Sequence, residues 1–203
     1  MTMTLHSPQV HGFFTVPTDP LTARHLFIRY FREKQYDPTT TVVVSPDIGR
    51  AKPAARFAKH LGFSMAAAQK ERISDNEVRF GDTLERQIKG FKRALVYDDE
   101  IATGSTVVEV SNLLVEYGVE EIAVICTHGL FTGDALRRLI DFPQITKIVT
   151  TDTVPQKEET RDPKLEIISV ASVFGEAIWR NARRQSIGRL YSFHEELEDL
   201  SEN

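Results

Sequence analysis

The sequence has 203 residues, of which 41% are hydrophobic and 27% charged, a composition typical of a globular protein rather than of a disordered or fibrous one. Its formal net charge of −4 argues against broad nucleic-acid binding, although a few local cations and backbone amides suffice for a small anionic ligand. The sequence shows no apolar run of the roughly 20 residues that span a membrane, and its N-terminus does not resemble a signal peptide.

The first half of the chain predicts strands alternating with helices. Residues 41–44 (TVVV) are expected to form a buried strand, followed by a turn at 45–50. A helix is then expected to reach about Leu61, with Gly62 as its stop signal. Residues 63–68 are the next expected strand. Residues 70–92 are polar and charged, which indicates a long flexible loop or hairpin.

The second half continues this alternation. An apolar stripe with helical spacing begins at Val107 and ends before Gly118. Further strands are expected at 94–97, 121–126, 145–150 and 165–170, and further helices at 134–140 and 174–183. The pattern predicts an α/β fold with a parallel β-sheet flanked by helices. In such folds the ligands bind at the carboxyl ends of the strands.

One cysteine is present, so an internal disulfide is excluded. Cys126 ends the apolar run 122–126, where a buried structural thiol is expected. This cysteine usage fits a reducing compartment, and we expect a cytoplasmic protein. The acidic residues 194–203 are expected to form a frayed terminal helix or a solvated end.

The strongest candidate for a binding site is the segment LVYDDEIATGST at residues 95–106. A strand delivers two carboxylates, and a loop of small residues then opens a helix whose amides can bind a phosphate. The carboxylates would repel a phosphate, so they are expected to face sugar hydroxyls or a metal. The simpler interpretation is an acidic turn with a helix cap. The residues expected to bind a ribose phosphate are Asp98, Asp99, Ala102, Thr103, Gly104, Ser105 and Thr106.

This segment resembles the ribose-5-phosphate-binding loop of type I phosphoribosyltransferases and of the ribose-phosphate pyrophosphokinase (PRPP synthetase) family. Residues 5–14 (LHSPQVHGFF) resemble the LHAxQIQGFF segment of the pyrophosphokinases, and residues 44–52 (VSPDIGRAK) resemble their SPDxGGAK pyrophosphate loop. Residues 70–78 resemble their flexible catalytic loop. Residues 127–131 and 151–155 also match in order, which favours the C-terminal half of a pyrophosphokinase.

The resemblance implies one phosphoribosyltransferase-like domain over residues 1–203, with an N-terminal segment 1–40, a core 41–185 and a tail 186–203. The implied reaction transfers diphosphate from ATP to ribose 5-phosphate and yields PRPP, with Mg²⁺ as cofactor. The implied roles are catalysis by Lys70 and Arg72, Mg²⁺ binding by His6 and Asp47, and diphosphate or ATP binding by Asp47, Gly49 and Arg50. Taken alone, these residues would be a surface histidine, a helix cap and a solvated charge cluster.

Two positions depart from the family pattern. Arg50 replaces the second glycine of the pyrophosphate loop, where it could bind a phosphate with two hydrogen bonds or obstruct it. Ala102 replaces an aspartate that many members carry, which removes one partner for a ribose hydroxyl or a metal. The family also carries a domain before the segment that matches His6, and that domain supplies most contacts to ATP. A fragment, a half supplied by a separate chain, and loss of kinase activity all stay open.

Three functions therefore compete: a PRPP-forming pyrophosphokinase, a PRPP-using phosphoribosyltransferase, and a non-catalytic ribose-phosphate-binding regulator. The expected partners are ribose 5-phosphate or PRPP and ATP, with neither nucleic acid nor a membrane. A homo-oligomer or an assembly with a synthetase-like chain is also expected. His128 and Phe131 follow a strand end and either line the site or pack in a turn, and Trp179 is expected in the core or an interface.

Overall fold

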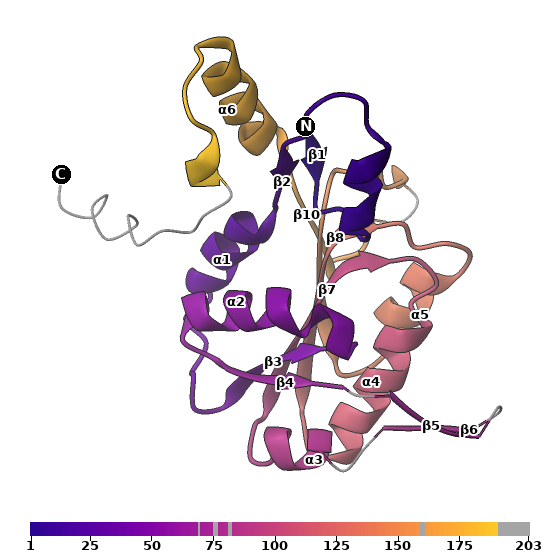
Figure 1. Ribbon diagram of the computed structural model, residues 1–203. Coiled ribbons are helices and arrows are strands. Elements are labelled where there is room, and N and C mark those ends of the chain that lie inside the picture. Colours follow the sequence, from indigo (N-terminus) through magenta and orange to yellow (C-terminus); the bar gives the residue numbers. More distant parts are fainter. Residues whose placement is uncertain (69, 75–76, 81–82, 159–160, 191–203) are drawn as a thin grey trace.

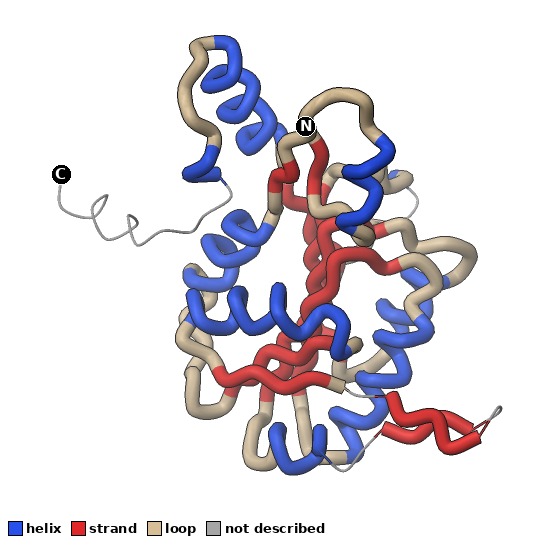
Figure 2. The backbone as a smooth tube through the Cα atoms, in the orientation of Figure 1, coloured by secondary structure: helices blue, strands red, loops and turns tan. Residues whose placement is uncertain are grey.

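The computed structural model describes residues 1–68, 70–74, 77–80, 83–158 and 161–190. A six-stranded parallel sheet in the order β10-β9-β8-β7-β3-β4 runs through its centre (Figures 1 and 2). Its strands are β3 (Thr41–Ser45), β4 (Ser64–Ala67), β7 (Arg93–Ile101), β8 (Glu121–Gly129), β9 (Ile145–Thr151) and β10 (Leu165–Ile168). The predicted parallel sheet flanked by helices is therefore confirmed.

Helices cover both faces of this sheet. One hydrophobic cluster packs α1 (Arg24–Arg32), α2 (Ala51–Leu61) and α6 (Ala171–Ala182) against it, and the other packs α3 (Thr83–Ile88), α4 (Ser105–Glu116) and α5 (Ala135–Asp141). Figure 1 shows α1 and α2 on the opposite side of the sheet from α4 and α5. Successive strand residues point to opposite faces, so Val42 and Val44 join one cluster and Val43 the other.

Strand β7 extends beyond its predicted end at residue 97 and reaches Ile101. The longer strand is paired with β8, in the register Asp98 to Cys126, Glu100 to His128 and Ile101 to Gly129. The acidic residues therefore belong to the strand, and the loop before α4 is shorter than predicted because β8 supplies backbone partners to a segment with low intrinsic strand propensity.

Residues 70–92 contain an antiparallel hairpin of β5 (Lys70–Ser74) and β6 (Glu77–Phe80), which projects from the sheet in Figure 1. Helix α3 follows it and was not predicted, and neither was α1. In the N-terminal segment, β1 (Thr2–Met3) pairs with β2 (Pro20–Leu21). Three short 3-10 helices lie in the described part of the chain with both ends given: η1 (Pro8–Phe13), η2 (Ile48–Arg50) and η4 (Gly188–Leu190). The predicted terminal helix at 194–203 lies outside the described residues.

Two single-residue expectations have different outcomes. Cys126 is fully buried as predicted, and burial raises the pKa of its thiol to about 12. Trp179 is 43% exposed on α6 with the Arg183 guanidinium 4.2 Å from its ring, so it is not a core residue, and its expected place in an interface stays a prediction. None of the helices in the described part of the chain has the length and apolarity of a membrane span.

The end of β8 is packed too tightly for any side chain larger than hydrogen. A Cβ atom on Gly129 would lie 2.4 Å from Phe131 Cε2 and 2.7 Å from Thr150 Oγ1. Phe131 itself is 9% exposed and belongs to the core, so its ring has little room to move.

Gly129→Ala should therefore lower the free energy of unfolding by about 1–3 kcal/mol, because the added methyl overpacks the core. Gly175→Ala is the matched control, since a Cβ there meets nothing within 4 Å in the middle of α6. It should stabilise the protein by about 0.5–1 kcal/mol. Urea unfolding followed by circular dichroism measures both values, and equal stabilities of the two variants would contradict this packing.

Candidate functional site

A pocket of about 360 Å³ lies at the carboxyl ends of β3 and β7, beside the start of α4. Three separate segments line it: His6 of the N-terminal segment, the turn after β3, and the end of β7 with the loop that follows. The turn contributes Pro46, Asp47 and Arg50, and the last segment contributes Asp98 and residues 100–107. The fold thus brings motifs that lie far apart in the sequence to one place.

The loop between β7 and α4 has the geometry of an anion-binding turn. Gly104 adopts a left-handed conformation (φ 71°, ψ 0°) directly before α4, and its carbonyl accepts the N–H of Val108 at 3.0 Å. The first amides of an α-helix have no partner within the helix, and here they belong to residues that line the pocket. The hydroxyls of Thr103 and Ser105 lie 3.3 Å apart at the same loop. This end of the pocket can bind a phosphate.

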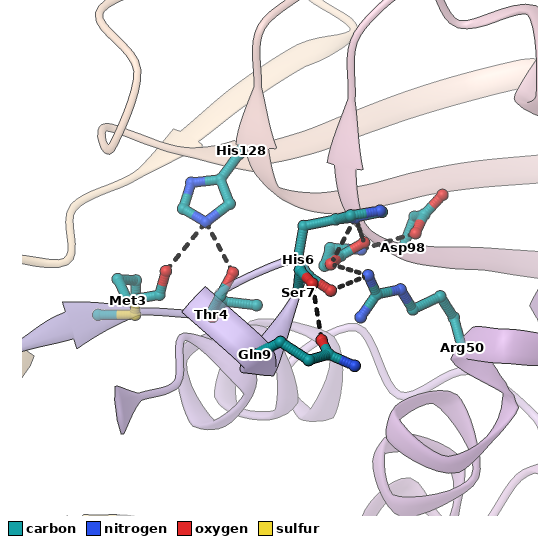
Figure 3. A network of polar contacts seen from close by, with 9 residues as sticks. Met3, Thr4, His6, Ser7, Gln9, Arg50, Asp98 and His128 are labelled. Carbon is teal, nitrogen blue, oxygen red and sulfur yellow. Dashed lines mark hydrogen bonds and ion pairs between the residues drawn. The ribbon is translucent and has the colours of Figure 1, made fainter. Parts of the chain in front are cut away.

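The carboxylates of β7 separate according to the two-residue period of a strand. Asp98 and Glu100 line the pocket, whereas the Asp99 side chain is 8% exposed and belongs to the opposite face of the strand. Arg50 Nη2 lies 3.0 Å from Asp99 Oδ2, and His6 Nδ1 lies 3.1 Å from the same oxygen. Arg50 also donates to the carbonyl of His6 (Figure 3). Asp99 therefore holds two residues that line the pocket instead of lining it itself.

Asp98 is a perturbed acid. Burial raises its pKa from 3.8 to about 7, and the neighbouring Asp99 carboxylate adds to that increase, while the Arg50 guanidinium opposes it. Its Oδ1 accepts the backbone N–H of Asp99 at 2.8 Å. When Asp98 is partly protonated, an anionic ligand in the pocket is repelled less than it would be by fully ionised Asp98 and Glu100 carboxylates.

The N-terminal segment contacts the sheet through His128 as well as through the pair of His6 and Asp99. His128 Nε2 lies 3.1 Å from the carbonyl oxygen of Met3 and 3.0 Å from that of Thr4 (Figure 3). Its Nδ1 lies 2.9 Å from Thr153 Oγ1. His128 therefore has a structural role close to the site, and Phe131 packs in the core. Of the two interpretations open at the sequence level, packing describes both residues.

Asp47 combines a capping role with exposure to the pocket. Its Oδ1 accepts the N–H of Gly49 at 3.1 Å, while the residue itself remains exposed. Among the residues that the structure describes, no group of three or more histidine, cysteine or acidic side chains could hold a metal ion. Mg²⁺ is commonly held by one or two protein carboxylates together with substrate phosphates, so the exposed Asp47 carboxylate suits an ion that arrives with a nucleotide. His6 offers a nitrogen in place of the oxygen that Mg²⁺ prefers, and its Nδ1 already lies 3.1 Å from Asp99 Oδ2.

The backbone of Lys70 and Arg72 belongs to β5, but the structure does not describe the side chains of these two residues. Glu100 and Arg138 were not among the residues expected to act at the site. Glu100 lines the pocket beside Asp98, and the two-residue period of a strand could have indicated it once β7 was known to continue. Arg138 of α5 donates to the carbonyl of Thr103, a long-range contact for which the sequence carries no signal.

Known proteins resemble this chain over most of its length. A protein of Streptomyces coelicolor is 45% identical over 195 residues, covering 94% of this chain and 59% of that protein. The ribose-phosphate pyrophosphokinase of Rhodopirellula baltica is 39% identical over 191 residues, covering 94% of this chain and 60% of the enzyme. The chain thus spans about 60% of the length of these relatives.

The same relation appears in three dimensions. The crystal structure of phosphoribosylpyrophosphate synthetase from Mycobacterium smegmatis superimposes with a TM-score of 0.77 and 33% identity, covering 90% of this chain and 58% of that chain. The model of the phosphoribosyl synthetase-associated domain family matches residues 86–192, which include the loop at the pocket and Arg138. The chain belongs to the phosphoribosyl synthetase-associated domain family, and the resemblance to ribose-phosphate pyrophosphokinases is confirmed.

Proposed function

We propose that the chain carries the ribose 5-phosphate site of a ribose-phosphate diphosphokinase, which transfers diphosphate from ATP to ribose 5-phosphate and yields PRPP. One observation carries the proposal. A helix-start loop suited to a phosphate, two carboxylates suited to sugar hydroxyls, and a turn with Asp47 and Arg50 all line one pocket. The names of the relatives agree with this chemistry, and the chain spans only part of their length.

In the proposed complex the 5-phosphate contacts the loop amides at Gly104 and the first turn of α4. The ribose hydroxyls face Asp98 and Glu100, which leaves the 1-hydroxyl directed towards the turn after β3. That oxygen attacks the β-phosphorus of ATP, the bond from this phosphorus to the α-phosphate oxygen breaks, AMP leaves, and the hydroxyl proton is released. Mg²⁺ held by His6 and Asp47 would neutralise charge on the phosphates.

Lys70 and Arg72 are proposed to add positive charge at the transferring group, as the resemblance implies. The reaction is mostly positioning and charge stabilisation, so cations on a hairpin beside the sheet suit it. Action in the cytoplasm, and assembly as a homo-oligomer or with a synthetase-like chain, belong to the same proposal. Arg50 forms an ion pair with Asp99 and lines the pocket, so a diphosphate bound there would contact its guanidinium.

A second candidate is a ribose-phosphate-binding regulator without turnover. Ala102 lines the pocket with a methyl group where many pyrophosphokinases have an aspartate, which lowers the number of polar partners for a ribose or a metal. Binding of ribose 5-phosphate together with absence of AMP formation would favour this candidate.

The first test measures AMP formation from ATP with ribose 5-phosphate and Mg²⁺, using the chain alone and together with a separately expressed N-terminal half of a synthetase. We expect AMP formation to depend on ribose 5-phosphate. Lys70→Ala and Arg72→Ala should each lower kcat by about 10²–10³-fold, the range seen when one stabilising donor is removed from a transition state. Lys92→Ala is the control, because Lys92 forms an exposed ion pair with Glu120 away from the pocket.

Unchanged turnover in the Lys70 and Arg72 variants would contradict their catalytic role. If no combination forms AMP while the chain still binds ribose 5-phosphate, the result would contradict the kinase proposal and favour the ribose-phosphate-binding regulator. Release of diphosphate from PRPP with a nucleobase would instead support a phosphoribosyltransferase.

The ionisation of Asp98 gives a pH-dependent prediction. Because its folded-state pKa is raised from 3.8 to about 7, its contribution to stability is present below about pH 4 and is lost as the pH rises through 7. Asp98→Asn cannot ionise, so at pH 8 it should exceed the wild type in free energy of unfolding by about 2 kcal/mol, less than the full shift implies because the side chain is half-buried. The difference should approach zero at about pH 4.

Urea unfolding of both proteins from pH 4 to pH 8 measures this difference. Asp141→Asn is the control for the same chemical change at an exposed position, because that carboxylate is 67% exposed on α5. A stability difference for Asp98→Asn that stays constant across this range would show that Asp98 is an ordinary surface acid.

A further inference from the structure

The loop that opens α4 is supported from one side by the segment that precedes and includes α5. The backbone N–H groups of Phe131 and Thr132 donate to the carbonyls of Ile101 and Ala102 at 3.0 and 2.9 Å. At Gly104, the position of a Cβ atom would lie 3.6 Å from the Cβ of Ala135. The loop therefore rests on α5, and a side chain of α5 can act on its backbone.

Arg138 is that side chain. Its Nη2 donates to the carbonyl oxygen of Thr103, and its Nε lies 3.3 Å from Oδ1 of Asp134, one turn earlier. The Arg138 side chain is 41% exposed, so it bridges the surface of α5 and the edge of the pocket. Asp134 restricts the direction of the guanidinium, because an ion pair at this spacing lies on one face of the helix.

The contact matters because of which backbone group it engages. A loop binds a phosphate when its amides face the ligand and its carbonyl oxygens are turned elsewhere, since a carbonyl oxygen would repel the anion. The Thr103 carbonyl belongs to the peptide group that carries the Gly104 amide, and the two point in opposite directions. A charged donor on that oxygen fixes the orientation of the peptide and places a positive charge beside the pocket.

We propose that Arg138 is a positioning residue for the phosphate of ribose 5-phosphate, acting through the Thr103–Gly104 peptide. The inference rests on the proposed function, and it adds a residue that the motif at 95–106 does not contain. The geometry assigns Asp134 the role of orienting Arg138.

The test compares Arg138→Ala, Arg138→Lys and Arg137→Ala in the chain of 203 residues. Arg137 is the matched control because it is the neighbour of Arg138 on α5 and also pairs with an aspartate four residues away, Asp141. Its side chain is 85% exposed, and its ion pair is with Asp141 on the helix surface. Isothermal titration with ribose 5-phosphate, inorganic phosphate and Mg·ATP gives the affinities. Hydrogen exchange of residues 103–107 reports on the loop amides.

Arg138→Ala should weaken binding of ribose 5-phosphate by about tenfold, the usual effect of losing a hydrogen bond to a charged group. The affinity for inorganic phosphate should fall by a similar factor, whereas the affinity for Mg·ATP should change less than threefold. Hydrogen exchange of the loop amides should become faster. Arg138→Lys should recover most of the affinity, because an ammonium still donates to the carbonyl. Arg137→Ala should match the wild type.

Three results would overturn the proposal, and only the third of them also overturns the proposed function. If the wild type binds ribose 5-phosphate and Arg138→Ala binds it equally well, Arg138 has no positioning role and the proposed function stands. Equal losses of affinity in the Arg137→Ala and Arg138→Ala variants lead to the same conclusion, because the removal of any positive charge from α5 would then explain them. If the wild type binds neither ribose 5-phosphate nor inorganic phosphate, the loop is not a phosphate site and both proposals fail.

Discussion

Strand β7 imposes the constraint on which the site depends, because consecutive side chains of a strand must point to opposite faces of the sheet. Asp98 and Glu100 therefore lie on the pocket side, and Asp99 lies on the other side, almost fully buried. A buried carboxylate is stable only with partners. Arg50 and His6 supply them, which draws the turn after β3 and the N-terminal segment to the end of the strand.

The result is a pocket with two kinds of wall. One wall is the start of α4, where unpaired amides and hydroxyls favour an anion. The other wall carries Asp98 and Glu100, which favour hydroxyl groups. A sugar phosphate has both functions in one molecule, so the two walls suit it better than a simple phosphate or a neutral sugar. Arg50, from the turn after β3, also lines the pocket and carries a positive charge.

The sequence predicted what depends on local pattern. Unbroken apolar runs located β3 and β8, and the loop of small residues at 102–106 indicated the phosphate wall. The end of β7 was missed because acidic residues disfavour strands in isolation, and pairing with β8 overrides that preference. Helix α1 was missed because the residue at its N-cap is Ala23, which offers no capping side chain. The contact of His6 with Asp99 joins residues 93 positions apart, so no local pattern encodes it.

The central claim is that ribose 5-phosphate binds at the start of α4 with its phosphate on the loop amides. A titration of ¹⁵N-labelled protein with ribose 5-phosphate, followed by amide chemical shifts, tests it directly. We expect the largest shifts at Gly104, Ser105 and Thr106, with smaller ones at Asp98 and Glu100, and ribose without phosphate should not move the loop amides. Saturable shifts confined to another surface, or none at millimolar ligand, would contradict the claim.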